Sequence, residues 1–462
     1  MSWQTPLFGT TGKVFILIFL CLLLLIPLNM VEDLIRERAG LAQQAEQSIA
    51  RGWGGEQLGL LPMLQLKYQR EVLRKEETST ETQFVYLSAQ SATVEGRLSV
   101  EERAIGIHRL PVYNASLNFR GRFASEDFPQ HGSEADAWRL VRAGVVLAPG
   151  DLTGLREIKD PQFAGQPLRF VPTSIRLDAW NAAEQGDLAA ASLGAHKERA
   201  VLLAELPLTQ LDPALGLNFD IAIELAGARS LKFIPNAGEL SVVLSGAWPH
   251  PSFLGAVLPR ERKVGVEGFA ADWKVMNLST GIPTVLCCDL GQSTAWNAQA
   301  LGVSLVQPGG TYQQNERSGK YGFMVLALTL AALFLSELLL GVRLHPLHYL
   351  QVGLALAVFY LLLLALSEHF GFDWSYLVAA GTVVLLVAAY MAAVLRRWWR
   401  GALCGGLLAS LYVFLYVIIG AEEMSLLLGA VGLTAILAAA MYLTRRIDWY
   451  SPAPISAPAD PA

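Results

Sequence analysis

The stretch VFILIFLCLLLLIPLNMV, from Val14 to Val31, decides the architecture of this 462-residue chain. Its 18 residues hold no charged side chain, and Lys13 is the one charge that precedes it. The hydrophobic core of a cleaved secretory signal is only about 7 to 15 residues long and ends in a small-residue cleavage site, which this stretch lacks. We therefore expect an uncleaved anchor helix that crosses a membrane.

This helix is expected to continue beyond the membrane. Apolar residues keep the i, i+3, i+4, i+7 spacing of a helix face until Gly52, Gly54 and Gly55 break the pattern. They are Val31, Leu34, Ile35, Leu41, Ala42, Ala45 and Ile49.

Five further apolar stretches of about 20 residues follow in the last third of the chain. At a rise of 1.5 Å per residue, each can cross a hydrocarbon core of about 30 Å. Gly401 and Gly405 lie on one face of the fourth of these stretches and permit close helix packing. With the anchor, we expect six transmembrane helices, the last five at Phe323 to Leu340, Tyr349 to Ser367, Trp374 to Leu395, Ala402 to Gly420 and Met424 to Leu443.

The charged residues separate the chain into two kinds of segment. Only 9 of the 75 lie among the 123 residues from Gly322 to Thr444, whereas 61 lie among the 290 residues from Glu32 to Tyr321. The longer segment is about as charged as a soluble domain, which averages about 25%. This distribution excludes a soluble enzyme, a fibrous protein and a disordered chain. A net charge of −5 provides no basic surface, so no nucleic acid is expected as a partner.

The segment between Leu58 and Gly310 shows the period-two pattern of β-strands. Apolar residues from Tyr113 to Phe123, and again from Leu217 to Leu225, alternate with polar ones. Shorter strands are expected at Leu231 to Ile234 and Leu240 to Leu244, and a helical piece around 133–143. The sequence thus predicts an α+β membrane protein whose large domain is mainly antiparallel β and sandwich-like.

Short connections between the helices set the orientation. On the side of the membrane where the N-terminus lies, the short segments carry seven Lys or Arg residues, and on the opposite side they carry none. We therefore expect both termini in the cytoplasm and the β domain in the periplasm of a bacterium. The predicted division is an anchor helix at 1–31, a β-rich domain with a leading helix at 32–321, a five-helix membrane domain at 322–444 and a disordered tail at 445–462. The basic residues are Lys13, Arg343, Arg396, Arg397, Arg400, Arg445 and Arg446.

Catalytic signatures are missing from the sequence. It contains no H-E-x-x-H, G-x-S-x-G, C-x-x-C or phosphate-binding loop. His345 and His348 are spaced so that they could share a metal ion, but no third ligand lies nearby and a membrane-interface loop is the favoured interpretation. We expect no enzyme activity, no metal and no cofactor.

Three polar residues at the predicted spans are candidates for function. Glu337 is a carboxylate within a span, which is costly and therefore suggests a transport or proton role. Because it lies near the cytoplasmic end, it could instead reach the interface or pair with Arg343. Glu368 and His369 form an adjacent acid and imidazole pair at the outer end of a span that could titrate near neutral pH, but a solvated helix end is the favoured interpretation.

The β domain contains a stiff segment, Trp248-Pro249-His250-Pro251-Ser252-Phe253. Each proline fixes its own φ and restricts the preceding residue, so the segment presents its rings in one geometry. It could form a binding loop. The favoured alternative is that Trp248 and Phe253 close the end of the β core.

A second polar segment joins the β domain to the last five spans. Tyrosine is typical of the membrane interface, and charged residues accompany it here. Any coupling between the domains must pass through this segment or through the helix after Val31. Its candidate coupling residues are Tyr312, Glu316, Arg317, Lys320 and Tyr321.

Several motifs along the whole chain resemble the CreD family of inner membrane proteins, also described as cell envelope integrity proteins. The resemblance implies a bacterial membrane protein made under envelope stress and linked to tolerance of colicins, detergents and β-lactams. It supplies no catalytic residues. The motifs are LIRERAG at Leu34, RGWGG at Arg51, WPHPSFLGAVLP at Trp248, YQQNERSGKYG at Tyr312, HPLHYLQVGLALAVFYLLLLALSEHFGF at His345 and YLTRRIDWY at Tyr442.

Two functions remain open from the sequence. The favoured one is a non-enzymatic factor for envelope integrity, whose β domain binds an envelope component or another protein while the helices anchor it in the lipid bilayer. The other is a transporter or channel that uses Glu337, Glu368 and His369, with the β domain as a periplasmic cap.

Overall fold

The computed structural model describes most of the chain, and its contacts divide the chain into two compact units. The helical unit comprises residues 1–42 and 309–462, and the β unit comprises residues 43–308. The tail expected to be disordered lies almost wholly outside the described residues. These are 10–74, 77–124, 126, 128, 138–175, 199–211, 217–287, 296–307, 311–340, 342, 344–421 and 424–445.

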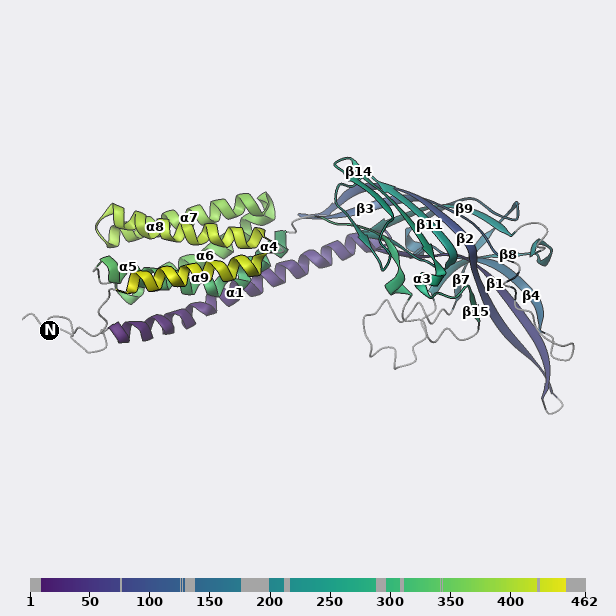
Figure 1. Ribbon diagram of the computed structural model, residues 1–462, viewed down its shortest axis with the longest axis horizontal. Helices are drawn as coiled ribbons and strands as arrows, with labels where there is room; N and C mark the ends of the chain where they lie inside the picture. The colour runs from purple at the N-terminus through teal and green to yellow at the C-terminus, as the bar shows by residue number, and fades with distance from the viewer. Residues whose placement is uncertain are drawn as a thin grey trace, which may run out of the picture. The chain divides into compact units, whose positions relative to one another are not determined.

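Helices of the chain agree with the predicted spans (Figure 1), and the last part of α1, from residue 43, belongs to the β unit. Five of them are long and apolar enough to cross a membrane, and α4 with α5, bent by 47°, would make a sixth. As predicted, α1 continues past the apolar stretch and ends at Gly52. The helices are α1 Thr10–Gly52, α4 Thr311–Lys320, α5 Gly322–Leu340, α6 Pro346–Phe370, α7 Phe372–Val394, α8 Trp398–Gly420 and α9 Ser425–Thr444.

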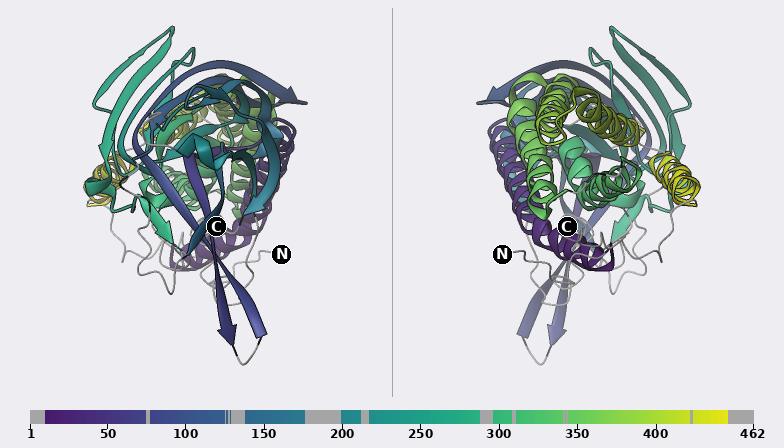
Figure 2. Two further views of the ribbon diagram at one scale, coloured as in Figure 1. Left: turned by 90° about the vertical axis from the view of Figure 1, so that its right-hand side faces the viewer. Right: turned by 90° about the vertical axis from the view of Figure 1, so that its left-hand side faces the viewer.

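Close packing of α7 on α8 depends on the two glycines singled out in the sequence. A Cβ atom at Gly401 would lie 2.5 Å from the carbonyl oxygen of Ala388, and one at Gly405 would lie 2.7 Å from the Ala388 Cβ. Only glycine therefore allows this approach. By contrast, α9 lies at the edge of the unit (Figure 2), with mostly exposed side chains.

The β unit contains sixteen strands among the described residues, joined into one continuous hydrogen-bonded network. Their bounds are β1 Gln57–Arg74, β2 Glu77–Ile105, β3 His108–Arg122, β4 Arg139–Ala148, β5 Leu155–Phe163, β6 Gln166–Pro167, β7 Phe170–Ile175, β8 Arg199–Leu206, β9 Asn218–Ala228, β10 Ser230–Ile234, β11 Ala237–Gly246, β12 Pro251–Leu254, β13 Glu261–Gly265, β14 Gly268–Met276, β15 Val285–Cys287 and β16 Leu301–Leu305.

Two sheets share the long strand β2. Its first part pairs with β1 in one sheet, and its second part pairs with β3 in the other. Most pairs are antiparallel, as predicted, but β1 with β10 and β2 with β11 are parallel. Aromatic contacts across the shared core join the sheets: the rings of Phe119 and Phe233 are 6.0 Å apart, and those of Phe253 and Trp273 are 5.8 Å apart. The two sheets thus enclose a sandwich-like core.

One local prediction was wrong. The helical piece expected around 133–143 falls partly outside the described residues, and its described end is strand β4, which begins at Arg139. The apolar run from Ala143 to Ala148 is buried and pairs with both β1 and β8. A continuous apolar run of this length fits a buried strand as well as a helix, so only its neighbours determine the outcome.

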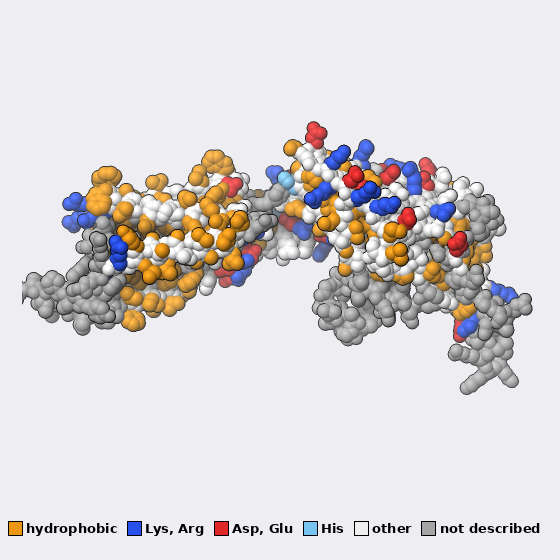
Figure 3. Space-filling view, viewed as in Figure 1, with side chains coloured by type: hydrophobic (Ala, Val, Ile, Leu, Met, Phe, Trp, Pro, Cys, Tyr) orange, Lys and Arg blue, Asp and Glu red, His pale blue; other side chains and the backbone are white. Residues whose placement is uncertain are grey.

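Surface composition differs between the units. Hydrophobic side chains are spread over the visible face of the helical unit, which shows few charged ones, whereas charged side chains of both signs are spread over the described surface of the β unit (Figure 3). This difference is what a membrane domain and a water-facing domain require.

Candidate functional site

In the stiff proline segment, the aromatic side chains serve mainly as anchors. The indole N–H of Trp248 donates to the carbonyl of Val306 at 3.0 Å, and the backbone N–H of Val306 donates to the carbonyl of His250 at 3.2 Å. Phe253 lies in β12, and its ring packs against that of Trp273 in the core. Pro249 and His250 are exposed. The rings thus hold the segment to the core, and the exposed prolyl-histidine step is the part accessible to a partner.

The last turns of α1 belong to the β unit, and a tight turn follows them. Gly54 and Gly55 both have positive φ, +95° and +69°. A Cβ atom at Gly54 would lie 2.5 Å from the Cα of Gly154, so only glycine fits. Just before the turn, Ile49 and Trp53 pack against Leu110 at the start of β3. These contacts identify the surface on which the last turn of α1 packs.

Gln57 forms the polar centre of this turn. Its side chain is fully buried and makes three hydrogen bonds. The amide group donates to the carbonyls of Gly54 at 2.6 Å and Ala226 at 3.1 Å, and its oxygen accepts from the backbone N–H of Asp151 at 2.9 Å. One side chain thus connects the helix end, β9 and the turn before β5.

Two aromatic residues complete the attachment, and we call Trp53, Gln57 and Tyr113 the joint. The indole N–H of Trp53 donates to the Tyr113 carbonyl at 3.2 Å, and the Tyr113 hydroxyl donates to the Ser230 carbonyl at 2.8 Å. Burial, aided by the nearby Glu56 carboxylate, raises the pKa of Tyr113 well above its usual range, so this hydroxyl stays a donor. The motif RGWGG contains Trp53, but sequence reasoning missed Gln57, which belongs to no motif.

The polar segment before the last spans is the helix α4 of the helical unit. The hydroxyl of Tyr312 donates to the Glu368 carboxylate at 3.2 Å, and the Asn315 amide donates to the Ser367 hydroxyl at 2.7 Å. Of the other candidate coupling residues, Glu316 and Lys320 form an ion pair at 3.5 Å. Arg317 and Tyr321 are half-buried, and His369 is exposed. The structure thus gives Glu368 a tyrosine partner from α4.

Glu337 is buried in the helical unit with a partner that the sequence did not suggest. Its side chain is 7% exposed and forms an ion pair with Lys13 of α1. The Tyr349 hydroxyl of α6 donates to its second carboxylate oxygen at 2.6 Å. We call Lys13, Glu337 and Tyr349 the Glu337 cluster. The expected alternative partner, the side chain of Arg343, lies outside the described residues.

The two histidines near the start of α6 have separate partners. His345 caps the helix, because its ring nitrogen Nδ1 accepts from the Leu347 N–H at 3.3 Å. The Nδ1 atom of His348 lies 2.6 Å from the Tyr390 hydroxyl. No group of three or more His, Cys, Asp or Glu residues suited to a metal ion occurs in the described part of the chain.

The Glu337 cluster and the Tyr312–Glu368 pair lie at opposite ends of α6. Tyr349 and Glu368 are 19 residues apart, which is about 28 Å along a helix. Between them the helix is apolar apart from Gln351, Tyr360 and Ser367. The structure does not bring Glu337 together with Glu368 or His369.

A bundle of apolar helices joined to a large two-sheet unit, with a buried ion pair among the helices, defines a multi-pass membrane protein with a large water-facing domain. The chain belongs to the CreD family, because the family model described as "Inner membrane protein CreD" matches residues 10–450. It is also 31% identical over 454 residues to the inner membrane protein CreD of Escherichia coli (strain K12), covering 97% of this chain and 95% of that protein. The chain is therefore an inner membrane protein with several membrane-spanning helices.

Proposed function

We propose that this protein maintains the integrity of the cell envelope under envelope stress without catalysing a reaction, through binding of an envelope component by its β unit. The stress role is the one that the family resemblance implies. One observation carries the binding role: more than half of the chain, residues 43–308, forms a unit with its own two-sheet core. An anchor alone would not need such a unit.

The proposal places the β unit in the periplasm and both termini in the cytoplasm. Support comes from the basic residues at the predicted cytoplasmic side, including Arg396 and Arg397 in the turn between α7 and α8. The turn between α6 and α7, on the opposite side, contains Gly371 between two phenylalanines and no basic residue.

The joint supports a mechanical role for α1. The end of α1 lies within the β unit, where Gln57 links the Gly54 turn to β9 and to the turn before β5. A flexible linker would suffice if the helix only tethered the β unit. We infer that α1 transmits the position of its end to the sheets around Tyr113.

The buried Glu337 cluster is the observation that favours the second candidate function, transport. Ionisable residues inside a membrane commonly mark ion or proton pathways. Two features weigh against it: Lys13 already neutralises Glu337, and about 28 Å of mainly apolar helix separates the cluster from Glu368.

Complementation of a null strain, scored by survival in detergent and β-lactam, tests the proposal. We expect a chain ending at residue 308, which keeps α1 and the β unit, to protect the cells. A full chain with Glu337→Gln, Glu368→Gln and His369→Ala should protect as well. Membrane fractionation and protease resistance of the β unit serve as controls for insertion and folding. If both proteins accumulate in the membrane and neither protects, the helices carry the function and the transport hypothesis is favoured.

A further inference from the structure

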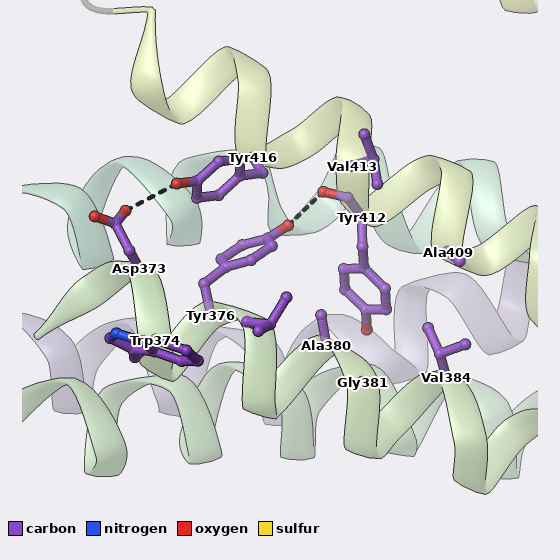
Figure 4. A pocket seen from close by; sticks show the side chains of 11 residues that line it. Asp373, Trp374, Tyr376, Ala380, Gly381, Val384, Ala409, Tyr412, Val413 and Tyr416 are labelled. Atoms are coloured by element: carbon purple, nitrogen blue, oxygen red, sulfur yellow. Dashed lines mark hydrogen bonds between the residues drawn. The ribbon is translucent and has the colours of Figure 1, made fainter. Parts of the chain in front are cut away.

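A groove runs along the outer surface of α7 and α8 within the helical unit (Figure 4). Its volume is about 480 Å³, within the range of about 300 to 1,000 Å³ that small-molecule sites occupy. Large side chains form its edges: Trp374, Leu377 and Val413 are 69%, 63% and 64% exposed. Ala380 and Gly381 lie between them and leave the space open.

The groove has the length of one bilayer leaflet. Its lining on α7 extends from Asp373 to Val384, which is 11 residues or about 16 Å. A hydrocarbon core is about 30 Å thick, so the groove covers about half of it. One end is therefore at the membrane surface and the other is near the bilayer centre.

The surface end carries an acidic group held in place. The Tyr416 hydroxyl donates to the Oδ1 atom of Asp373 at 3.0 Å, and the Tyr376 hydroxyl donates to the Tyr412 carbonyl at 2.6 Å, so both tyrosines are fixed along the groove. The sequence from His369 to Leu395 holds no Lys or Arg, and neither does that from Gly401 to Gly420. This end therefore repels an anionic headgroup and attracts a cationic one.

We propose that this groove binds one phospholipid with an amine headgroup, such as phosphatidylethanolamine, from the leaflet on the side of Asp373. One acyl chain lies in the groove, and the ammonium group of the headgroup binds the Asp373 carboxylate. On the predicted orientation, this is the periplasmic leaflet. A second transmembrane helix is a poorer occupant, because a helix is about 10 Å wide and packs on small-residue faces, whereas Trp374 and Leu377 border this groove.

Lipid retention by the full-length protein tests the proposal. The protein is reconstituted into nanodiscs of equal parts dioleoyl-phosphatidylethanolamine and dioleoyl-phosphatidylglycerol, transferred to mild detergent and analysed by native mass spectrometry. We expect about one retained lipid per chain, with the ethanolamine lipid enriched over its share of the nanodisc.

Three variants locate the site. Gly381→Leu fills the groove, and a Cβ atom there meets nothing within 4 Å, so no neighbouring atom blocks the first carbon of the new side chain. It should abolish retention of both lipids. Asp373→Asn should still retain about one lipid but no longer enrich the ethanolamine lipid. Gly406→Leu is the matched control, because Gly406 is an exposed glycine of α8 outside the groove whose Cβ also meets nothing within 4 Å. It should behave like the wild type.

Retention of the ethanolamine lipid by Gly381→Leu at the wild-type level would overturn the proposal, as would equal retention of the two lipids by the wild type. A third contrary result is a wild-type dimer without retained lipid that Gly381→Leu converts to a monomer, because the occupant would then be a helix of a second copy.

Discussion

Two buried polar sites hold the two ends of α1, and they use different chemistry. At the joint, neutral groups make the contacts, and every hydrogen bond of Gln57 has a backbone partner. At the other end, the Glu337 cluster uses one ion pair and one tyrosine. The joint lies in a protein core, where strands supply many donors and acceptors. In the helical bundle the backbone groups bond within each helix, so few donors and acceptors are free. A single ion pair therefore holds this end of α1.

The largest effect is expected from removing the cation of the Glu337 cluster. Lys13→Met leaves a buried carboxylate without its counter-ion, and loss of one partner of a buried pair costs about 3–5 kcal/mol. Unfolding of the full chain in micelles, followed by helical circular dichroism, measures it.

The double variant Lys13→Met with Glu337→Leu is the decisive control. It removes both charges, and replacing a whole buried pair by apolar residues is often nearly neutral. We therefore expect it to recover most of the lost stability. If the double variant is as unstable as the single one, packing rather than charge explains the site, and the contrast with the joint disappears.

A smaller loss of folding stability is expected from a substitution at the joint. Gln57→Leu removes the partners of two carbonyls and one N–H, and unsatisfied buried groups cost about 1–3 kcal/mol each, partly offset by relaxation. We expect a net loss of about 2–4 kcal/mol, measured by hydrogen exchange of β1 and β9 amides in the full chain. Gln69→Leu serves as the control, since among the described residues the side chain of Gln69 donates to the Thr82 hydroxyl at the surface, at 3.3 Å. Equal effects of the two substitutions would contradict the role of the joint.

The fold could be predicted from the sequence largely because its signals are local. Apolar runs of about 20 residues define α5 to α9, and strict alternation defines β3 and β9. The exit of the chain from α1 was likewise visible in Gly52, Gly54 and Gly55. Strand β4 could not be predicted, because a short buried apolar run shows neither the helical nor the period-two pattern.

The polar sites could be predicted only in part. Glu337 stood out as a carboxylate in an apolar helix, yet its partner Lys13 is 324 residues away, and no local spacing relates the two. Gln57 gave no signal, because an isolated glutamine at the start of a strand is ordinary until the carbonyl of Ala226 is brought beside it. Contacts of this kind arise from topology, which single-sequence periodicity does not contain.

The cationic neighbours of Trp53 make the joint testable at finer scale. The guanidinium groups of Arg103 and Arg156 lie 4.8 and 5.6 Å from the centre of its ring. Trp53→Phe keeps an aromatic face and loses the indole N–H, whereas Trp53→Leu loses both. We expect Trp53→Leu to be less stable than Trp53→Phe by about 0.5–1 kcal/mol, measured by the same hydrogen exchange. Equal stability would show that the arginines contribute no attraction to the ring.

The smallest effect is expected from an ion pair at the surface of the β unit, and it completes the contrast with the Glu337 cluster. Lys159 donates to Glu224 at 2.8 Å on an exposed face. This hydrogen bond, with a further one from Ser116, holds the pKa of Glu224 below its usual range, although partial burial opposes the shift. Because the folded pKa lies below the unfolded one, the pair stabilises the fold above the unfolded pKa, about 4.3, and loses this effect as the pH falls through the folded pKa.

Thermal unfolding of the wild type and of Glu224→Gln from pH 7 to pH 3 measures this contribution. The melting temperatures should differ slightly at pH 7 and converge at the acidic end, because the wild-type carboxylate is then protonated. A difference at pH 7 as large as that of Lys13→Met would mean that burial is not what separates the two pairs. Solvent screening makes that outcome unexpected for Lys159 and Glu224, whereas Lys13 and Glu337 have no comparable access to water.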